Sequence, residues 1–286
     1  MSQLSLITSS NSYYGEVLFR NTNTYTGSSP STSLAISRTP RLDFELSTSY
    51  TWKVPEGVSS ISVVCIGGGG SGDGDNGTAG GCGGGGGALS YVNNIPVVPQ
   101  EELTVYVGKK SDATSGFHGE QGGAAGLIRG TKTLVFAAGG GGGAGSASDY
   151  GMGGNYIIGT GFYGGNGGTG GSSTGGEGGG AGQFASNGAD GLDGNRVGAS
   201  GTGTLPYGFD TGSFFLSVSN TRYGYPFGGG GGGANDETSG GVRQNGTQGG
   251  ESCVRIIWGG GRGFPSFGAG ESFSNGNVTN IDVANP

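Results

Sequence analysis

The chain has 286 residues, of which 74 are glycine; 12% are charged, and the formal net charge is −7. Its 13 Lys and Arg residues are scattered through an acidic sequence and cannot form the basic surface that nucleic-acid phosphates require, so we expect no nucleic-acid partner. No run approaches the roughly 18 apolar residues of a membrane helix, so we expect no membrane insertion.

Glycine is unevenly distributed along the chain. Residues 1–50 contain only Gly15 and Gly27, whereas most of the others lie between 67 and 250. A composition so rich in glycine is typical of disorder, because glycine loses the most conformational freedom on folding. The 12 Tyr, the 13 Phe and the recurring apolar runs nevertheless favour a folded protein. We therefore divide the chain into an N-terminal extended arm or docking region (1–51), a glycine-rich domain (52–261) and a C-terminal tail (262–286).

The N-terminal region is rich in Ser, Thr, Asn and Tyr and is interrupted by Pro30 and Pro40. Its stretches 15–20, 33–36 and 41–46 are short, and 43–46 alternates polar and apolar residues, as a half-buried strand does. These patterns predict an extended arm with a few strands. Such an arm can be a docking element or a flexible tail.

The glycine-rich region contains short β-branched runs bounded by glycine or proline, a pattern that predicts strands. The expected strands cover 61–66, 88–92, 103–107, 133–138 and 253–258. The first, fourth and fifth of these runs lead directly into glycine tracts. No segment has a 3.6-residue apolar period, so we expect almost no helix.

The glycine tracts need another source of order, because they have few side chains to bury. A glycine chain can adopt the polyproline-II path, with three residues per turn, and neighbouring chains can then hydrogen-bond to one another. Collagen is excluded because the strict Gly-X-Y repeat is absent and proline is scarce. The predicted fold is all-β, with an irregular polyglycine-II-like bundle flanked by a β-sandwich or sheet.

Motifs for catalysis or cofactors do not stand out above chance. The GxGxxG match at 72–77 is followed by more glycine and not by the helix that dinucleotide binding requires. The GxSxG match at 171–175 would need a histidine base for its serine, and the chain contains a single histidine, His118. We therefore predict no enzyme activity and no cofactor. The cysteines Cys65, Cys82 and Cys253 have no metal-binding spacing, and we expect Cys65 and Cys253 to be buried free thiols.

Two acidic clusters could offer oxygen ligands to Ca²⁺: Asp73 with Asp75 and Asn76, and Asp190 with Asp193. Neither has the spacing of an EF-hand loop. We interpret them as turn residues on exposed loops and predict no metal site.

Aromatic residues mark two kinds of position. Trp52 and Trp258 flank the glycine-rich domain beside strand-like runs and are predicted core anchors. Two aromatic-rich inserts, 149–163 and 205–227, interrupt the glycine tracts and are candidate receptor-contact loops. Their candidate residues are Tyr150, Tyr156, Phe162, Tyr163, Tyr207, Phe209, Asp210, Phe214, Phe215, Arg222, Tyr223, Tyr225 and Phe227.

The ordered non-glycine residues carry a resemblance to known proteins. The stretch WKVPEGV at 52–58, followed by ISVVCIGGGG at 61–70, resembles the opening of a glycine-rich domain of phage tail and fibre proteins. The stretches 83–96, 103–108 and 136–143 continue the likeness, which covers about residues 52–261. The region is also similar to polyglycine-II adhesins of phage tail fibres, and the ending 254–266 resembles virion proteins of marine phages.

This resemblance implies a virion protein, synthesised in the host cytoplasm, that mediates host attachment as a tail-fibre or fibre-tip component. Its expected partners are other virion proteins of the fibre, tail or capsid and a host receptor such as a glycan or an outer-membrane protein; a homotrimer would suit a fibre. Residues 1–50 depart from the fibre-attachment domain of the adhesins, so a capsid decoration or collar protein docked through its N-terminal arm remains the alternative. A bacterial surface protein is a third reading.

Overall fold

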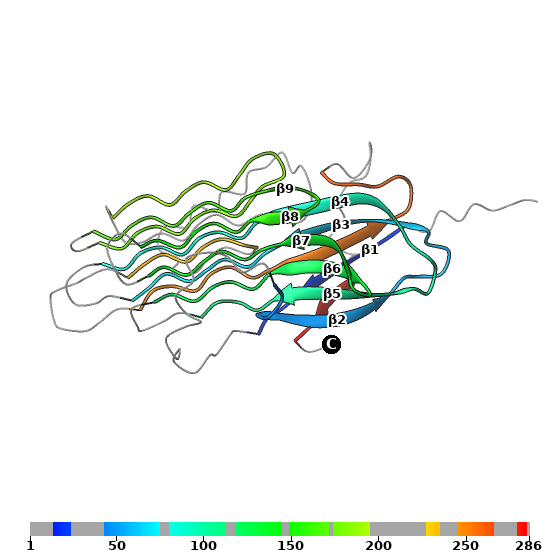
Figure 1. The fold of residues 1–286 in the computed structure, drawn as a ribbon, viewed down its shortest axis with the longest axis horizontal. Coiled ribbons are helices and arrows are strands. Elements are labelled where there is room, and N and C mark those ends of the chain that lie inside the picture. The colour runs from blue at the N-terminus through cyan, green and yellow to red at the C-terminus, as the bar shows by residue number, and fades with distance from the viewer. Residues whose placement is uncertain are drawn as a thin grey trace, which may run out of the picture.

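The structure is a computed structural model that describes residues 14–23, 43–74, 80–112, 118–144, 149–171, 174–194, 227–234, 245–265 and 279–284. Within these ranges every regular element is a strand, so the predicted all-β fold without helix is confirmed. Nor do these ranges offer any helix long and apolar enough to cross a membrane. The molecule is elongated, with a β-sandwich at one end and a bundle of wavy, parallel-running segments at the other (Figure 1).

The sandwich consists of two sheets. The strands are β1 (Gly15–Arg20), β2 (Ser47–Lys53), β3 (Ser60–Ile66), β4 (Leu89–Pro96), β5 (Glu102–Gly108), β6 (Ala125–Arg129), β7 (Lys132–Ala137), β8 (Tyr156–Ile158), β9 (Thr160–Phe162), β10 (Cys253–Trp258) and β11 (Thr279–Asp282). The first sheet has the order β11-β1-β10-β3-β4-β9, and the second β2-β5-β6-β7-β8. All neighbours pair antiparallel except β1 and β11, which are parallel.

Apolar side chains from the inner faces of both sheets form the main core. It includes Val63 and Ile256 from the first sheet and Leu103, Val105 and Leu127 from the second, all without measurable exposure. The outer face of the first sheet is buried as well, because three phenylalanines from outside the strands cover it: Phe184, Phe227 and Phe264. Burial on both faces explains why β3 and β10 are almost continuously apolar instead of alternating.

The strands at 61–66, 103–107, 133–138 and 253–258 are found close to their predicted positions, and β1 coincides with the expected 15–20. The stretch 43–46 was predicted to be a strand but forms a bend and turn before β2. The Phe44 ring there covers Gly126, stacks on Tyr106 at a centroid distance of 4.3 Å and meets Phe136 edge-on at 5.0 Å. Its apolar character therefore serves packing on the sheet surface and not strand pairing.

The described parts of the expected arm and tail belong to the sandwich. β1 lies between β10 and β11 in the first sheet, and the expected boundary between residues 51 and 52 falls within β2. The division into 1–51, 52–261 and 262–286 is thus not followed by these strands, because β10 offers a free edge that β1 fills. The expected strand at 33–36 lies outside the described residues.

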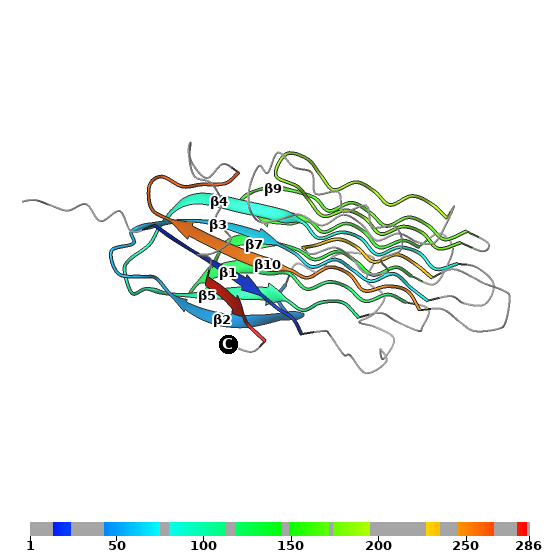
Figure 2. The same cartoon turned by 180° about the vertical axis from the view of Figure 1, so that it is seen from behind.

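The wavy segments of the bundle extend directly from one end of the sandwich strands (Figure 2). Its backbone bonds repeat every three residues, as a polyglycine-II lattice requires. In segment 67–73, Gly67 donates to Ala88, Gly68 to Gly123 and Gly69 to Gly250, and the cycle then restarts with Gly70 donating to Gly85. The next segment, 80–88, is surrounded completely: it donates to three neighbouring segments and accepts from three others.

This lattice accounts for the glycines. A Cβ added at Gly70 would lie 2.0 Å from the carbonyl oxygen of Gly141, and one at Gly86 would lie 2.0 Å from that of Gly180. Such positions exclude every side chain, since each Cα faces a neighbour's carbonyl group. The predicted polyglycine-II character of the glycine tracts is therefore confirmed.

Candidate functional site

The exposed edge of the bundle is formed by two adjacent segments, 163–171 (the floor segment) and 187–194 (the outer segment). They run parallel, and Gly188, Gly191 and Gly194 of the outer segment donate to the carbonyls of Tyr163, Asn166 and Thr169, each at 2.8 Å. Cβ atoms at Gly188 and Gly191 would collide with the backbone of segment 174–182. One residue in three of the outer segment therefore has to be glycine.

In the opposite direction, N–H groups of the floor segment donate to side-chain oxygens of the outer segment. Asn187 Oδ1 accepts the Tyr163 N–H at 3.0 Å, and Asp190 Oδ1 accepts that of Asn166 at 2.7 Å. Asp193 Oδ1 accepts both the N–H of Thr169, at 2.8 Å, and its hydroxyl, at 2.7 Å. We call Asn187, Asp190 and Asp193 the Asx row. Asp190 and Asp193 were expected on turns, but all three side chains form successive hydrogen bonds along an extended segment.

The sequence contained a signal for this row. Residues 187–194 read NGADGLDG, in which Asn or Asp recurs every third residue and is followed by glycine. That period matches the three residues per turn of a polyglycine-II strand. The hydrogen bonds from the N–H and the hydroxyl of Thr169 lower the pKa of Asp193, so this side chain is ionised at neutral pH.

Exposed apolar side chains occur on the floor segment, on the outer segment and on segment 149–155, which accepts hydrogen bonds from the floor segment. Tyr150, Met152 and Tyr163 expose 38%, 43% and 45% of their surface, and Leu192 exposes 67%. Tyr150 and Tyr163 were predicted as contact residues. The structure thus places two of the aromatic candidates on the bundle surface, and one of them, Tyr163, is hydrogen-bonded to the Asx row.

Other predicted contact residues are placed differently. Phe227 is 6% exposed and packs on the outer face of the first sheet, so its assignment to an exposed loop is wrong. Phe162 lies in β9 and is half-buried against the same cluster, and Tyr156 begins β8. The insert 149–163 is thus a bundle segment followed by two short strands. The remaining candidates lie outside the described residues: Tyr207, Phe209, Asp210, Phe214, Phe215, Arg222, Tyr223 and Tyr225.

The two tryptophans join the sheets at the end of the sandwich away from the bundle. Trp52 is 7% exposed, and its ring centroid lies 5.8 Å from that of the half-buried Trp258. Gly15 faces Trp258 so closely that an added Cβ would lie 2.2 Å from the indole ring. All three cysteines are buried free thiols.

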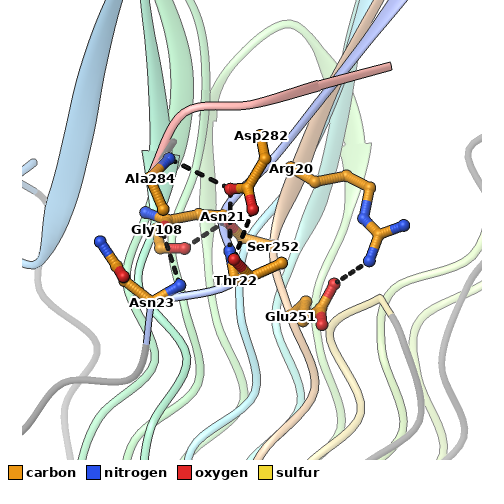
Figure 3. Close-up of polar contacts among 9 residues, drawn as sticks. All are labelled: Arg20, Asn21, Thr22, Asn23, Gly108, Glu251, Ser252, Asp282 and Ala284. Atoms are coloured by element: carbon orange, nitrogen blue, oxygen red, sulfur yellow. Dashed lines mark hydrogen bonds and ion pairs between the residues drawn. The ribbon is translucent and has the colours of Figure 1, made fainter. Parts of the chain in front are cut away.

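A polar cluster fastens the ends of the first sheet to the base of the bundle (Figure 3). Asp282 accepts hydrogen bonds from the N–H and hydroxyl of Thr22 and from the N–H of Ala284. Beside it, Arg20 pairs with Glu251 at 3.3 Å, and the Ser252 hydroxyl donates to the Gly108 carbonyl at 2.9 Å. These contacts connect residues in or next to β1, β5, β10 and β11. No sequence pattern predicted them.

Asp73 was expected on an exposed turn but lies inside the bundle with 1% exposure. Its N–H donates to the Cys82 carbonyl and its carbonyl accepts from Ala234, whereas its Oδ1 has no hydrogen-bond partner among the described residues. Burial raises the pKa of Asp73 to about 8, despite opposing backbone hydrogen bonds. Within the described ranges, no three His, Cys, Asp or Glu side chains gather as a metal site would require.

Asp73 gives the bundle a pH-dependent stability. Its pKa is about 8 in the folded chain and near 3.8 when unfolded, so folding takes up a proton and stability falls as pH rises from about 4 to about 8. We expect Asp73→Asn to raise the melting temperature at pH 8 and to change it little at pH 4. Calorimetry at both pH values checks this. Asp193→Asn is the matched control, because that pKa is lowered and the variant should not be stabilised at pH 8.

Comparison with curated proteins finds no match. A family model described as a glycine-rich domain matches residues 45–280. The match begins just before β2 and ends within β11, so it spans most of the sandwich and the whole described bundle. The chain therefore belongs to the glycine-rich domain family.

Proposed function

We propose that this chain is a structural protein of a phage virion and acts as a tail-fibre or fibre-tip component in host attachment. The observation that carries the proposal is that the hydrogen-bonded glycine lattice separates the far end of the bundle from the opposite end of the sandwich. Bundle segments are joined at the end away from the sandwich, as the pairs Gly171–Thr174 and Ala144–Asp149 show, whereas Tyr14 lies beside Gly260 at the opposite end of the sandwich.

Such a lattice suits the presentation of a recognition surface. Binding residues are commonly carried on connections that a rigid scaffold positions. Here main-chain hydrogen bonds join segment 80–88 to six neighbouring segments, so the segment ends keep fixed relative positions. The exposed Tyr150 and Tyr163 add aromatic faces of the kind that stack on sugars or on receptor side chains.

The resemblance of the non-glycine residues at 52–70 to phage fibre proteins supports the virion part of the proposal. The partners it implies are other virion proteins and a host surface receptor such as a glycan or an outer-membrane protein. The sandwich would then face the particle, and the far end of the bundle would face the host.

Two measurements on purified particles test this proposal. Immunogold labelling is expected at the tail or its fibres; labelling confined to the capsid surface would instead indicate a decoration protein and overturn the attachment role. In parallel, replacing residues 205–216 by a Gly-Ser linker should abolish adsorption while particles still assemble. Val98→Ser, an exposed change at the opposite end of the sandwich, is the control and should adsorb normally.

A further inference from the structure

The Asx row occupies the place of a missing lattice segment. A fully surrounded segment such as 80–88 donates its N–H groups in three directions in turn. The floor segment donates toward segment 149–155 through Gly164 and Gly167, and toward segment 174–182 through Gly165 and Gly168. Its third set of donors, Tyr163, Asn166 and Thr169, points to the position where a further segment would continue the bundle.

The outer segment fills this position with side chains. Their Oδ1 atoms lie 2.7–3.0 Å from the three donors, as the carbonyl oxygens of another glycine segment would. Asn166 repeats the arrangement one segment away, since its own Oδ1 accepts the N–H of Gly153 at 3.0 Å. Carboxylate and amide oxygens therefore replace main-chain acceptors along this edge.

Without these side-chain acceptors, the N–H groups of the edge could pair with the backbone of another chain. Rows of unpaired N–H and C=O groups are templates for adding a strand from another molecule, and native proteins block them. The glycine lattice is especially open to addition, because every segment repeats the same three-residue bonding pattern and glycine offers no steric selectivity. The most available source of a matching segment is a second copy of the same chain.

We propose that the Asx row is an edge cap that prevents the glycine bundle from adding a segment of a second copy. The cap works through acceptor oxygens placed on the donors of the floor segment. Charge is not essential, because Asn187 performs the same task as Asp190 and Asp193. The negative charges of the two aspartates add repulsion between copies.

The test compares a triple variant, Asn187→Ala with Asp190→Ala and Asp193→Ala, with the natural chain. At low protein concentration the amides of Tyr163, Asn166 and Thr169 should exchange hydrogen about tenfold faster, since each loses one strong acceptor. As concentration rises, sedimentation velocity should show larger species than the natural chain forms, and the three amides should regain protection.

Two controls separate the cap from general destabilisation. Asp190→Asn with Asp193→Asn keeps both acceptor oxygens and should match the natural chain in amide exchange and in size. Ala189→Ser with Leu192→Ala changes side chains that point to solvent from the same segment and should also behave as the natural chain. Slow amide exchange and unchanged size in the triple variant would overturn the proposal.

A single substitution covers the case in which the triple variant does not fold. Asp190→Ala removes one rung and should accelerate exchange at Asn166, leaving Tyr163 and Thr169 protected. Uniform acceleration of all three amides would show that the row acts only through overall stability, and would also contradict the edge cap.

Discussion

Gly70→Ala is expected to disrupt the bundle and to lower the free energy of unfolding by more than ~3 kcal/mol. The added Cβ would lie 2.0 Å from the Gly141 carbonyl oxygen and 2.5 Å from its carbon, and both atoms belong to backbone held by hydrogen bonds on other sides. The lower entropy of the unfolded alanine variant offsets only ~0.4–1 kcal/mol of this loss. Chemical denaturation monitored by circular dichroism measures the change.

Gly68→Ala provides the matched control two residues earlier in the same segment. Its Cβ would lie 3.3 Å from the Gly250 carbonyl oxygen and 3.5 Å from the backbone of Gly123, so neighbouring atoms need to move only by a few tenths of an ångström. We expect this variant to stay within ~1 kcal/mol of the natural chain. Equal stability of the two variants would contradict the tight packing of the lattice.

The sequence predicted several strands and the polyglycine-II segments better than it predicted which strands pair with one another. The runs that became β3, β5, β7 and β10 are short, β-branched and bounded by glycine, so local pattern sufficed. β6 was not predicted, because its sequence AGLIR has only two large apolar residues and its Gly126 is required by the Phe44 ring. The position of β1 beside β10 depends on contacts more than 230 residues apart, which no local pattern encodes.

The same limit applied to the candidate site. The aromatic residues of 149–163 and 205–227 were grouped because they interrupt glycine, but composition alone does not distinguish a surface ring from one that covers a sheet. Phe227 covers the first sheet and Tyr163 faces solvent, although both adjoin glycine. The period of three in 187–194 was readable, yet its meaning depended on which segment lies beside it.

Glu16→Ala is expected to lower the free energy of unfolding by about 3–5 kcal/mol, because it removes a carboxylate that pairs with a fully buried guanidinium group. Arg255 of β10 has no side-chain exposure and pairs with Glu16 of β1, which is 11% exposed. Arg262 pairs with the same carboxylate at 3.0 Å. One carboxylate thus pairs with two guanidinium groups at the first sheet. Thermal and chemical denaturation would both report the loss.

Glu251→Ala tests whether this effect comes from burial. Its partner Arg20 keeps 42% side-chain exposure, so water can solvate the released charge and the expected loss stays within ~1 kcal/mol. A small loss for Glu16→Ala, similar to that of Glu251→Ala, would contradict the expectation that burial makes the Glu16–Arg255 pair important for stability. A loss several times larger would instead show that the Glu16 carboxylate helps to hold β1 against β10 in the first sheet.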